Sequence, residues 1–467
     1  MKSSNTKKIN GMVIFSAAAV LIACMFAGKT PLDGDPIWSS AVGHWIYYHH
    51  AVPQFDSFSW TVAGKPWLNH EWLFCLIAYI TRSHFGDIGF LLLAALNIFL
   101  LAGLLTMWIN KLNPSRAASI LCALGMIMLS RYISPRAYLI TYPLFLLLLY
   151  LLHFHAKDKH LYWAPLIIIL WVNFHSTAIY GVGMLVVESI YRTITKKEEA
   201  SRFWFITGLS VLATLVNPYG YRIWVYIAQF SFNPLNHYVN EFKAPDFSDF
   251  LLLGSYIIIL SIAILFFIRF AQKGLKYEES DVMYPFWFIA FYLYSLTSVR
   301  GGAYTIIFWL IMSMYYFKRL YDSDFSFIFQ IAMVSVLLIT VLIIFPKKPV
   351  VLYSPTQWPL AAIEYLEKHP KNQDHLYNQH VFGALLIDKG IKPFIDARGD
   401  VYVLPGVFQD VVNTEKLIKP PTVTFQKYGI KNIFIKGGTL LDIYMQGRPG
   451  WKEIYRDQVA VIYEINT

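Results

Sequence analysis

Charged residues are scarce in this chain of 467 residues. Asp, Glu, Lys and Arg make up 15% of it and hydrophobic residues 56%, against about 25% and about 45–50% in a soluble globular protein. Apolar runs long enough to cross a hydrocarbon core of about 30 Å recur along most of the sequence. The composition excludes a soluble enzyme and predicts a bundle of membrane-spanning helices.

Cysteine is scarce as well, and the Lys and Arg residues do not gather into a basic patch. The three cysteines lie inside or beside apolar runs and share no metal-ligand spacing, so we interpret them as buried thiols: Cys24, Cys75 and Cys122. The formal charge of +10 does not indicate nucleic-acid binding, because the basic residues are scattered between apolar runs. Most of them are interpreted as topology signals.

The apolar runs predict about eleven spans, the first being an uncleaved signal anchor. The predicted spans are 10–28, 70–84, 87–109, 115–130, 137–155, 162–188, 203–217, 249–270, 283–298, 303–318 and 325–345. Lys and Arg are concentrated on one side of these spans, which the positive-inside rule assigns to the cytoplasm. This predicts a multi-pass protein of the cell membrane with a cytoplasmic N-terminus, outward-facing loops 29–69 and 218–248, and Arg131 and Arg136 on the cytoplasmic side.

The composition changes near residue 349, where apolar runs shorten to a few residues separated by charges and turn formers. We therefore predict two domains: a transmembrane domain, 1–348, which includes loop 29–69, and an extracytoplasmic domain, 349–467. The predicted strands of the second domain are 375–378, 392–396, 431–436 and 459–465, and helices 380–389 and 406–418 lie between the first three of them. This alternation is typical of a small α/β layer with some parallel pairing.

The first external loop is rich in ionisable and aromatic residues. Its ionisable side chains lie among tryptophans and tyrosines, which suit a membrane interface: Asp33, Asp35, His44, His49, His50, Asp56, His70 and Glu71. An interfacial helix with incidental polar groups is one interpretation. The other is a carboxylate at the outer membrane surface that acts as general base toward the hydroxyl of an acceptor.

A reaction at that surface with a lipid phosphate as leaving group needs cationic or hydrogen-bonding partners. The candidates on the predicted outer face are His44, His70, Arg222 and Arg300. Asn173 and His175 fall inside the predicted span 162–188, where a polar side chain normally faces the bundle interior. They are interpreted either as interhelical hydrogen-bonding groups or as substrate contacts.

Two short motifs have structural as well as functional interpretations. "NHEW" at 69–72 shares part of the zinc motif H-E-x-x-H, but Phe occupies position 74, and a helix that begins at Asn69 with Glu71 in its first turn explains the same residues. "IDARGDVY" brings together Asp396, Arg398 and Asp400 after a predicted strand, either as an internal Arg–Asp pair or as a functional group.

Several segments carry a family resemblance. "DGDPIWSSAVGHW" (33–45) and "VPQFDSFSWTVAGKPWLNHEWL" (52–73) resemble the opening motifs of a family of bacterial multi-spanning proteins related to GT-C glycosyltransferases. Later segments that also resemble it are "SPRAYLITYPLFLLLLYLL" (134–152), "LWVNFHST" (170–177), "LVNPYGYR" (215–222), "SVRGGAYTIIFW" (298–309) and "YNQHVFGALLIDKGIKPFIDARGDVY" (377–402). The resemblance covers most of the chain.

The resemblance implies a fold and site residues. The fold would be an all-α polytopic membrane bundle, GT-C-like, with a small C-terminal α/β domain. Asp35 matches the second aspartate of the opening motif, where the catalytic carboxylate is expected, and Asp33 matches the first. The chain departs from the pattern at Ser39, where the family usually has histidine, and at Gly34, where it has proline.

The resemblance also implies an activity. A sugar would pass from a polyprenyl-phosphate-linked donor to an extracytoplasmic glycan, lipid or protein acceptor at the bilayer surface. No cofactor is implied with certainty, and a divalent metal remains open. The alternative is a non-catalytic component of glycan-lipid translocation or assembly built on the same scaffold.

Overall fold

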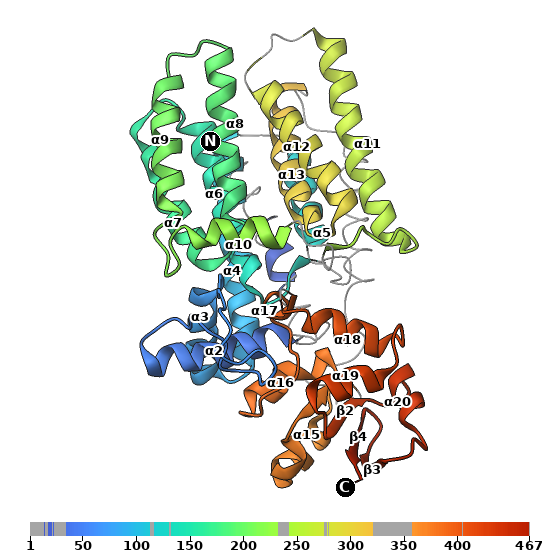
Figure 1. Cartoon of the computed structure of the whole chain (residues 1–467). Helices are drawn as coiled ribbons and strands as arrows, with labels where there is room; N and C mark the ends of the chain where they lie inside the picture. The colour runs from blue at the N-terminus through green and yellow to red at the C-terminus, as the bar shows by residue number, and fades with distance from the viewer. Residues whose placement is uncertain are drawn as a thin grey trace.

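The computed structural model describes residues 14, 17–20, 22, 34–112, 116–129, 132–231, 242–274, 278, 280–320, 357–403 and 405–466. The predicted span 325–345 lies outside these residues, as does most of 10–28. The described chain is mostly helical, with one four-stranded sheet near the C-terminus. Figure 1 shows a helical bundle at one end and the sheet with its helices, here called the tail (357–466), at the other.

The bundle is built from strongly apolar helices. They are α4 (Ile88–Leu112), α5 (Arg116–Leu129), α6 (Ala137–Phe154), α7 (Ala164–Phe174), α8 (Ala178–Ile194), α9 (Ala200–Ala213), α11 (Phe250–Lys273), α12 (Ser280–Thr297) and α13 (Gly301–Leu320). Within the described residues, three helical segments are long and apolar enough to cross a membrane by length and composition alone: α4, α6 and residues 252–273 of α11. Helices that are apolar all round are typical of a membrane bundle, so the predicted helical fold class is confirmed.

The predicted span 162–188 is in fact two helices. α7 ends at Phe174, His175 has extended backbone dihedrals, and α8 begins at Ala178. Asp158, just before α7, and Arg192, near the end of α8, line the same cavity at the end of the bundle remote from the tail. The two helices therefore run in opposite directions, joined by a turn that an apolar run alone does not reveal.

The predicted span 70–84 corresponds to α3 (Trp72–Phe85), which lies along α2 (Gly34–His49) between the bundle and the tail (Figure 1). The helices approach closely at Gly43, where a Cβ atom would lie 1.9 Å from the carbonyl oxygen of Cys75. Near the end of α3, Arg82 Nη2 lies 3.0 Å from Asp388 Oδ2 of the tail. If 70–84 crossed the membrane inward from loop 29–69, Arg82 would lie on the cytoplasmic side. Its contact with Asp388 is therefore incompatible with an extracytoplasmic tail unless 70–84 does not cross.

Arg136 and Asp35 were predicted on opposite sides of the membrane, and the structure contradicts this. Arg136 Nη1 lies 2.8 Å from Asp35 Oδ2, so a membrane cannot separate these two residues. The crossing predicted at 70–84 explains the misplacement. Without a crossing at 70–84, Arg136 falls on the same side of the membrane as Asp35. The additional crossing that results from splitting 162–188 returns the later loops to their predicted sides. Arg131 lies outside the described residues.

The tail contains a sheet of order β1-β2-β4-β3, in which β1 is parallel to β2 and the other pairs are antiparallel. The strands are β1 (Leu376–Asn378), β2 (Asn432–Lys436), β3 (Trp451–Arg456) and β4 (Ala460–Ile465), and the helices are α15 (Leu360–Lys368), α16 (Gly383–Asp388), α17 (Gly399–Val403), α18 (Val407–Glu415), α19 (Pro421–Tyr428) and α20 (Leu440–Met445). Three of the predicted strands and both predicted helices are confirmed, with small shifts of their ends.

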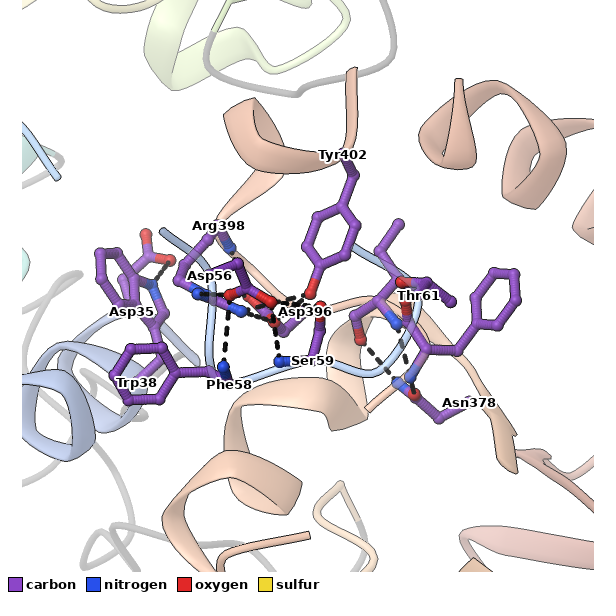
Figure 2. Close-up of polar contacts among 12 residues, drawn as sticks. Asp35, Trp38, Asp56, Phe58, Ser59, Thr61, Asn378, Asp396, Arg398 and Tyr402 are labelled. Atoms are coloured by element: carbon purple, nitrogen blue, oxygen red, sulfur yellow. Dashed lines mark hydrogen bonds and ion pairs between the residues drawn. The ribbon is translucent and has the colours of Figure 1, made fainter. Parts of the chain in front are cut away.

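The predicted strand 392–396 is wrong, and β3 was not predicted. Residues 392–396 form a loop whose polar backbone groups bond outside any sheet: Asn378 Oδ1 accepts from Phe394 N at 2.7 Å, and Asn378 Nδ2 donates to Ile395 O at 2.7 Å (Figure 2). The segment is apolar because it is buried, not because it pairs as a strand. β3 escaped prediction because "WKEIYR" is an edge strand in which three charged residues interrupt the apolar ones and no residue is fully buried.

Buried apolar residues form two clusters, and the smaller one joins distant parts of the sequence. It contains Ile37 and Val42 of α2 and Trp67 of the first loop together with tail residues such as Phe394 and Tyr402. The first loop and α2 therefore pack on the tail. The domain boundary near residue 349 remains a prediction, and this shared core positions the site described next.

Candidate functional site

A cavity of about 810 Å³ lies where the bundle meets the tail. Its walls come from α2, the segment before α3, α10 (Arg222–Ser231), the residue before α6, the residue before α13, and the tail. The charged and titratable side chains that line it are Asp35, His70, Glu71, Arg136, Lys243, Arg300, His380, Arg398, Asp400, Glu415 and Lys416. Its volume is typical of a small-molecule site, and its lining is unusually polar for one.

Asp35 lies in the first turn of α2, where a carboxylate is favoured by the helix dipole. Trp38 Nε1 donates to its Oδ1 at 3.1 Å (Figure 2), and Arg136 Nη1 lies 2.8 Å from its Oδ2. About a quarter of the Asp35 side chain, 26%, remains exposed. Asp35 is thus held in a fixed orientation and still faces the cavity. Asp33 lies outside the described residues.

Outside the tail, the cationic part of the wall comes from three separate segments. Arg136 precedes α6, Arg300 precedes α13, and Lys243 lies in the loop before α11. The Val299 amide donates to the carbonyl of Lys243 at 3.0 Å, and the Arg300 guanidinium lies over the ring of Phe242 at 4.3 Å. This arrangement can bind a phosphate group by charge-assisted hydrogen bonds.

His70, Glu71 and His175 form a polar cluster. Glu71 Oε1 lies 3.4 Å from His70 Nε2 and 3.3 Å from His175 Nε2, a grouping that could hold a metal ion. However, the backbone amide of Thr177 donates to His175 Nδ1 at 3.0 Å. A neutral His175 then carries its proton on Nε2, which makes that atom a donor toward Glu71 and not a metal ligand. The geometry fits a carboxylate between two imidazoles better than it fits a metal centre.

Asn173 is a structural hydrogen-bonding group. It accepts from Trp72 Nε1 at 2.9 Å, and its Nδ2 donates to the carbonyl oxygens of Ile169 and Val216, each at 2.8 Å. It lines an apolar groove beside α3 and α7 and is not part of the cavity wall. The hydrogen bonds of the first interpretation are present, and the choice between the two interpretations of Asn173 stays a prediction.

His44 and Arg222 also lie outside the cavity lining. His44 projects from α2 against Tyr48 and Tyr79, with ring centroids 4.7 Å and 5.1 Å apart. Arg222 is exposed at the start of α10, where its Nη1 lies 3.4 Å from Gln54 Oε1. The helix predicted to begin at Asn69 begins at Trp72, and Asn69 Oδ1 accepts from the Glu71 amide at 3.1 Å.

The tail contributes two carboxyl groups to the cavity wall. Burial raises the pKa of Asp400 to about 6, and His70 and Arg398 oppose this shift. Burial also raises the pKa of Glu415 to about 7. The sequence marked Asp400 only as part of "IDARGDVY", and nothing in the sequence marked Glu415, because its position depends on how α18 packs.

Arg398 joins the first loop to the tail. Its Nη1 lies 2.6 Å from Asp56 Oδ1, and its Nε and Nη2 lie 2.8 Å and 2.7 Å from the two oxygens of Asp396 (Figure 2). Tyr402 also donates to Asp396, and the side chains of the three charged residues are inaccessible to solvent. The predicted internal Arg–Asp pair is therefore present, with Asp56 as an additional partner from the first loop.

The fold is similar to those of solved glycosyltransferases. Neither a known family model nor a curated protein matches the chain in sequence. The structure of ArnT from Cupriavidus metallidurans bound to undecaprenyl phosphate matches with a TM-score of 0.54 and 11% identity over 97% of both chains. The arabinofuranosyltransferase AftD from Mycobacteria matches with a TM-score of 0.55 and 14% identity over 97% of this chain and 40% of AftD.

A mutant of AftD gives a TM-score of 0.54 at 13% identity, again over 97% of this chain and 41% of AftD. The chain therefore spans about two fifths of AftD but nearly the whole of ArnT. At this level of identity the similarity establishes the architecture and not the reaction. Together with the apolar helices of the bundle, these matches show that the chain is a membrane protein with the fold of the GT-C glycosyltransferases.

Proposed function

We propose that this protein is a membrane glycosyltransferase that moves a sugar from a polyprenyl-phosphate-linked donor to an extracytoplasmic acceptor. The observation that supports this most strongly is the common lining of one cavity by Asp35, Arg136 and Arg300 in a chain with the GT-C fold. A carboxylate beside two guanidinium groups offers a base and a phosphate site in one place. The bundle lies on one side of the cavity, from which a lipid donor can enter.

The proposed reaction proceeds by displacement at the anomeric carbon of the donor. The acceptor oxygen forms a bond to that carbon, the bond from the carbon to the phosphate oxygen breaks, and polyprenyl phosphate leaves with the bonding electrons. Asp35 takes the proton of the acceptor hydroxyl. Because Arg136 contacts Asp35 in this structure, a donor phosphate that draws the guanidinium toward itself frees Asp35 Oδ2 for the acceptor.

Other predicted residues take supporting roles in the proposal. His70 and Glu71 line the cavity and are assigned to substrate binding, and His175 orients Glu71. Asp33, two positions before Asp35 in the sequence, keeps its proposed catalytic role. His44, Asn173 and Arg222, which do not line the cavity, have no part in the reaction as proposed.

The protein is proposed to act on the outer face of the cell membrane, with domain 349–467 extracytoplasmic. This orientation puts the cavity at the level of the outer leaflet, where a lipid-linked donor and a polar acceptor can meet.

The test is turnover by the purified full-length protein with radiolabelled polyprenyl-phosphate sugars and a cell-envelope glycan fraction. We expect Asp35→Asn to lower the rate at least about a hundredfold, the typical contribution of a general base. Asp374→Asn, at a half-exposed tail carboxylate outside the cavity lining, serves as the control and should keep the native rate. An undiminished rate for Asp35→Asn contradicts the assignment, and donor binding without product by the native protein favours the non-catalytic translocation or assembly role.

A further inference from the structure

A second cavity of about 270 Å³, here called the tyrosine chamber, lies beside the main one. Arg136 and Arg300 line both spaces, so the two cavities meet at these guanidinium groups. The rest of the chamber wall is mainly tyrosine: Tyr132, Tyr138, Tyr142, Tyr180 and Tyr304. Among the described residues, no Asp or Glu lines the chamber.

The hydroxyl of Tyr142 indicates that the chamber takes a polar ligand. Tyr142 is only 4% exposed and lines the chamber, yet its hydroxyl forms no hydrogen bond with any residue that the structure describes. By contrast, the hydroxyl of Tyr304 lies 3.1 Å from Thr141 Oγ1, and Tyr180 donates to Tyr294 at 3.1 Å. The hydroxyl keeps access to the chamber, so it can exchange a hydrogen bond with a hydroxyl-bearing ligand there.

We propose that the tyrosine chamber binds the sugar ring of the lipid-linked donor and selects neutral or acidic sugars over amino sugars. This inference rests on the proposed function. In the donor, the phosphate is bonded directly to the anomeric carbon, so a phosphate held by Arg136 and Arg300 leaves the sugar within reach of the chamber. Aromatic side chains give the ring an apolar surface to pack on, and their hydroxyl groups give it hydrogen-bond partners.

The charges around the chamber account for the selection. An ammonium group in the chamber would lose its water beside two guanidinium groups, and His175 in the same wall adds no negative charge. Asp35 and Glu71 line the main cavity and not the chamber, and Glu71 lies between His70 and His175. A neutral sugar meets no such penalty, and a uronic acid gains attraction.

The experiment compares three lipids for binding to the full-length protein in nanodiscs: undecaprenyl phosphate, its glucosyl ester, and an ester of a 4-amino-4-deoxy sugar. The glucosyl ester should bind more tightly than the bare phosphate, and the amino sugar at least about tenfold more weakly than glucose. Tyr142→Phe removes a hydroxyl that has no protein partner among the described residues, so folding should be unaffected. It should weaken the glucosyl ester about fivefold, the size of one hydrogen bond, and leave the bare phosphate unchanged.

Tyr256→Phe is the matched control, because Tyr256 is buried in the bundle, donates to the carbonyl of Ser295 at 3.1 Å and lies outside the chamber lining. It should leave all three affinities at the native values. Equal losses for the sugar ester and the bare phosphate in Tyr142→Phe would overturn the proposal, as would equal affinity for the amino sugar and glucose. Tight, Tyr142-dependent binding of the glucosyl ester without turnover would support sugar binding in the chamber and contradict the proposed reaction. Failure of the chamber proposal can therefore be distinguished from failure of the proposed function.

Discussion

Replacing Arg398 by Met is predicted to detach the first loop from the tail. The guanidinium forms ionic hydrogen bonds with Asp56 and Asp396, at distances of 2.6–2.8 Å, and none of these side chains is accessible to solvent. Met fills much of the same volume but leaves two buried carboxylates without their cation. Removal of one partner from a buried ion pair costs about 3–5 kcal/mol, which increases the population of the opened state by about two to three and a half decades.

The effect should depend on pH. Burial alone would raise the pKa of Asp396, but Arg398 and the hydrogen bonds to this carboxylate hold it below its usual range. Because the pKa of Asp396 is lower in the folded protein than in the unfolded chain, this carboxylate stabilises the native protein at a pH above the unfolded-state pKa. That stabilisation is lost as the pH falls through the folded-state pKa. In Arg398→Met, burial acts without the compensating charge, so the carboxyl stays protonated to higher pH. The deficit of the variant should be large at pH 7.5 and smaller at pH 5.

Hydrogen exchange measured by mass spectrometry on the full-length protein in nanodiscs can test this. The reporters are the amide of Ser59, which donates to Asp56 at 3.0 Å, and that of Trp60, which donates to the carbonyl of Pro393 at 3.2 Å. Both should exchange about a hundredfold faster or more in Arg398→Met.

Lys431→Met supplies the control, because the Lys431–Asp374 pair is half-exposed and should be worth less than about 1 kcal/mol. Native exchange rates at Ser59 and Trp60 in Arg398→Met would refute the view that this network holds the loop on the tail.

Three further predictions concern the cavity and its orientation. Arg300→Ala should weaken undecaprenyl phosphate binding about ten- to a hundredfold in the nanodisc assay, and Arg300→Lys should recover part of the loss, because it keeps the charge without the planar fork. Cysteines at Ser57 and Lys431, both exposed, should react with an impermeant thiol reagent added outside cells, and one at Thr195 should not; the reverse pattern would invert the topology. Affinity for a sugar-phosphate diester should fall as the pH rises through about 6, where Asp400 becomes charged, and Asp400→Asn should abolish this step; an unchanged pH profile would contradict the assignment.

The sequence by itself determined the class of the fold and singled out Asp35, which lines the main cavity. Long apolar runs leave a chain few alternatives to spanning helices, because lipid requires every backbone polar group to bond within its own segment. Strands β1, β2 and β4 were equally readable, since short buried runs between turn formers are a local signal.

Tertiary structure decided which of these segments lie together. The bond from Arg398 to Asp56 joins residues 342 positions apart, and no local pattern encodes such a pairing. The position of α3 changed the face assigned to Arg136, because a charge-bias argument depends on the number of crossings that precede each loop. The turn at His175 lies after Arg136 and changes only the later spans. Asp400 and Glu415 reach the cavity only because the tail packs on the first loop. The walls of the site are made by contacts between remote segments, and these follow from how buried surfaces fit together and not from the order of the residues.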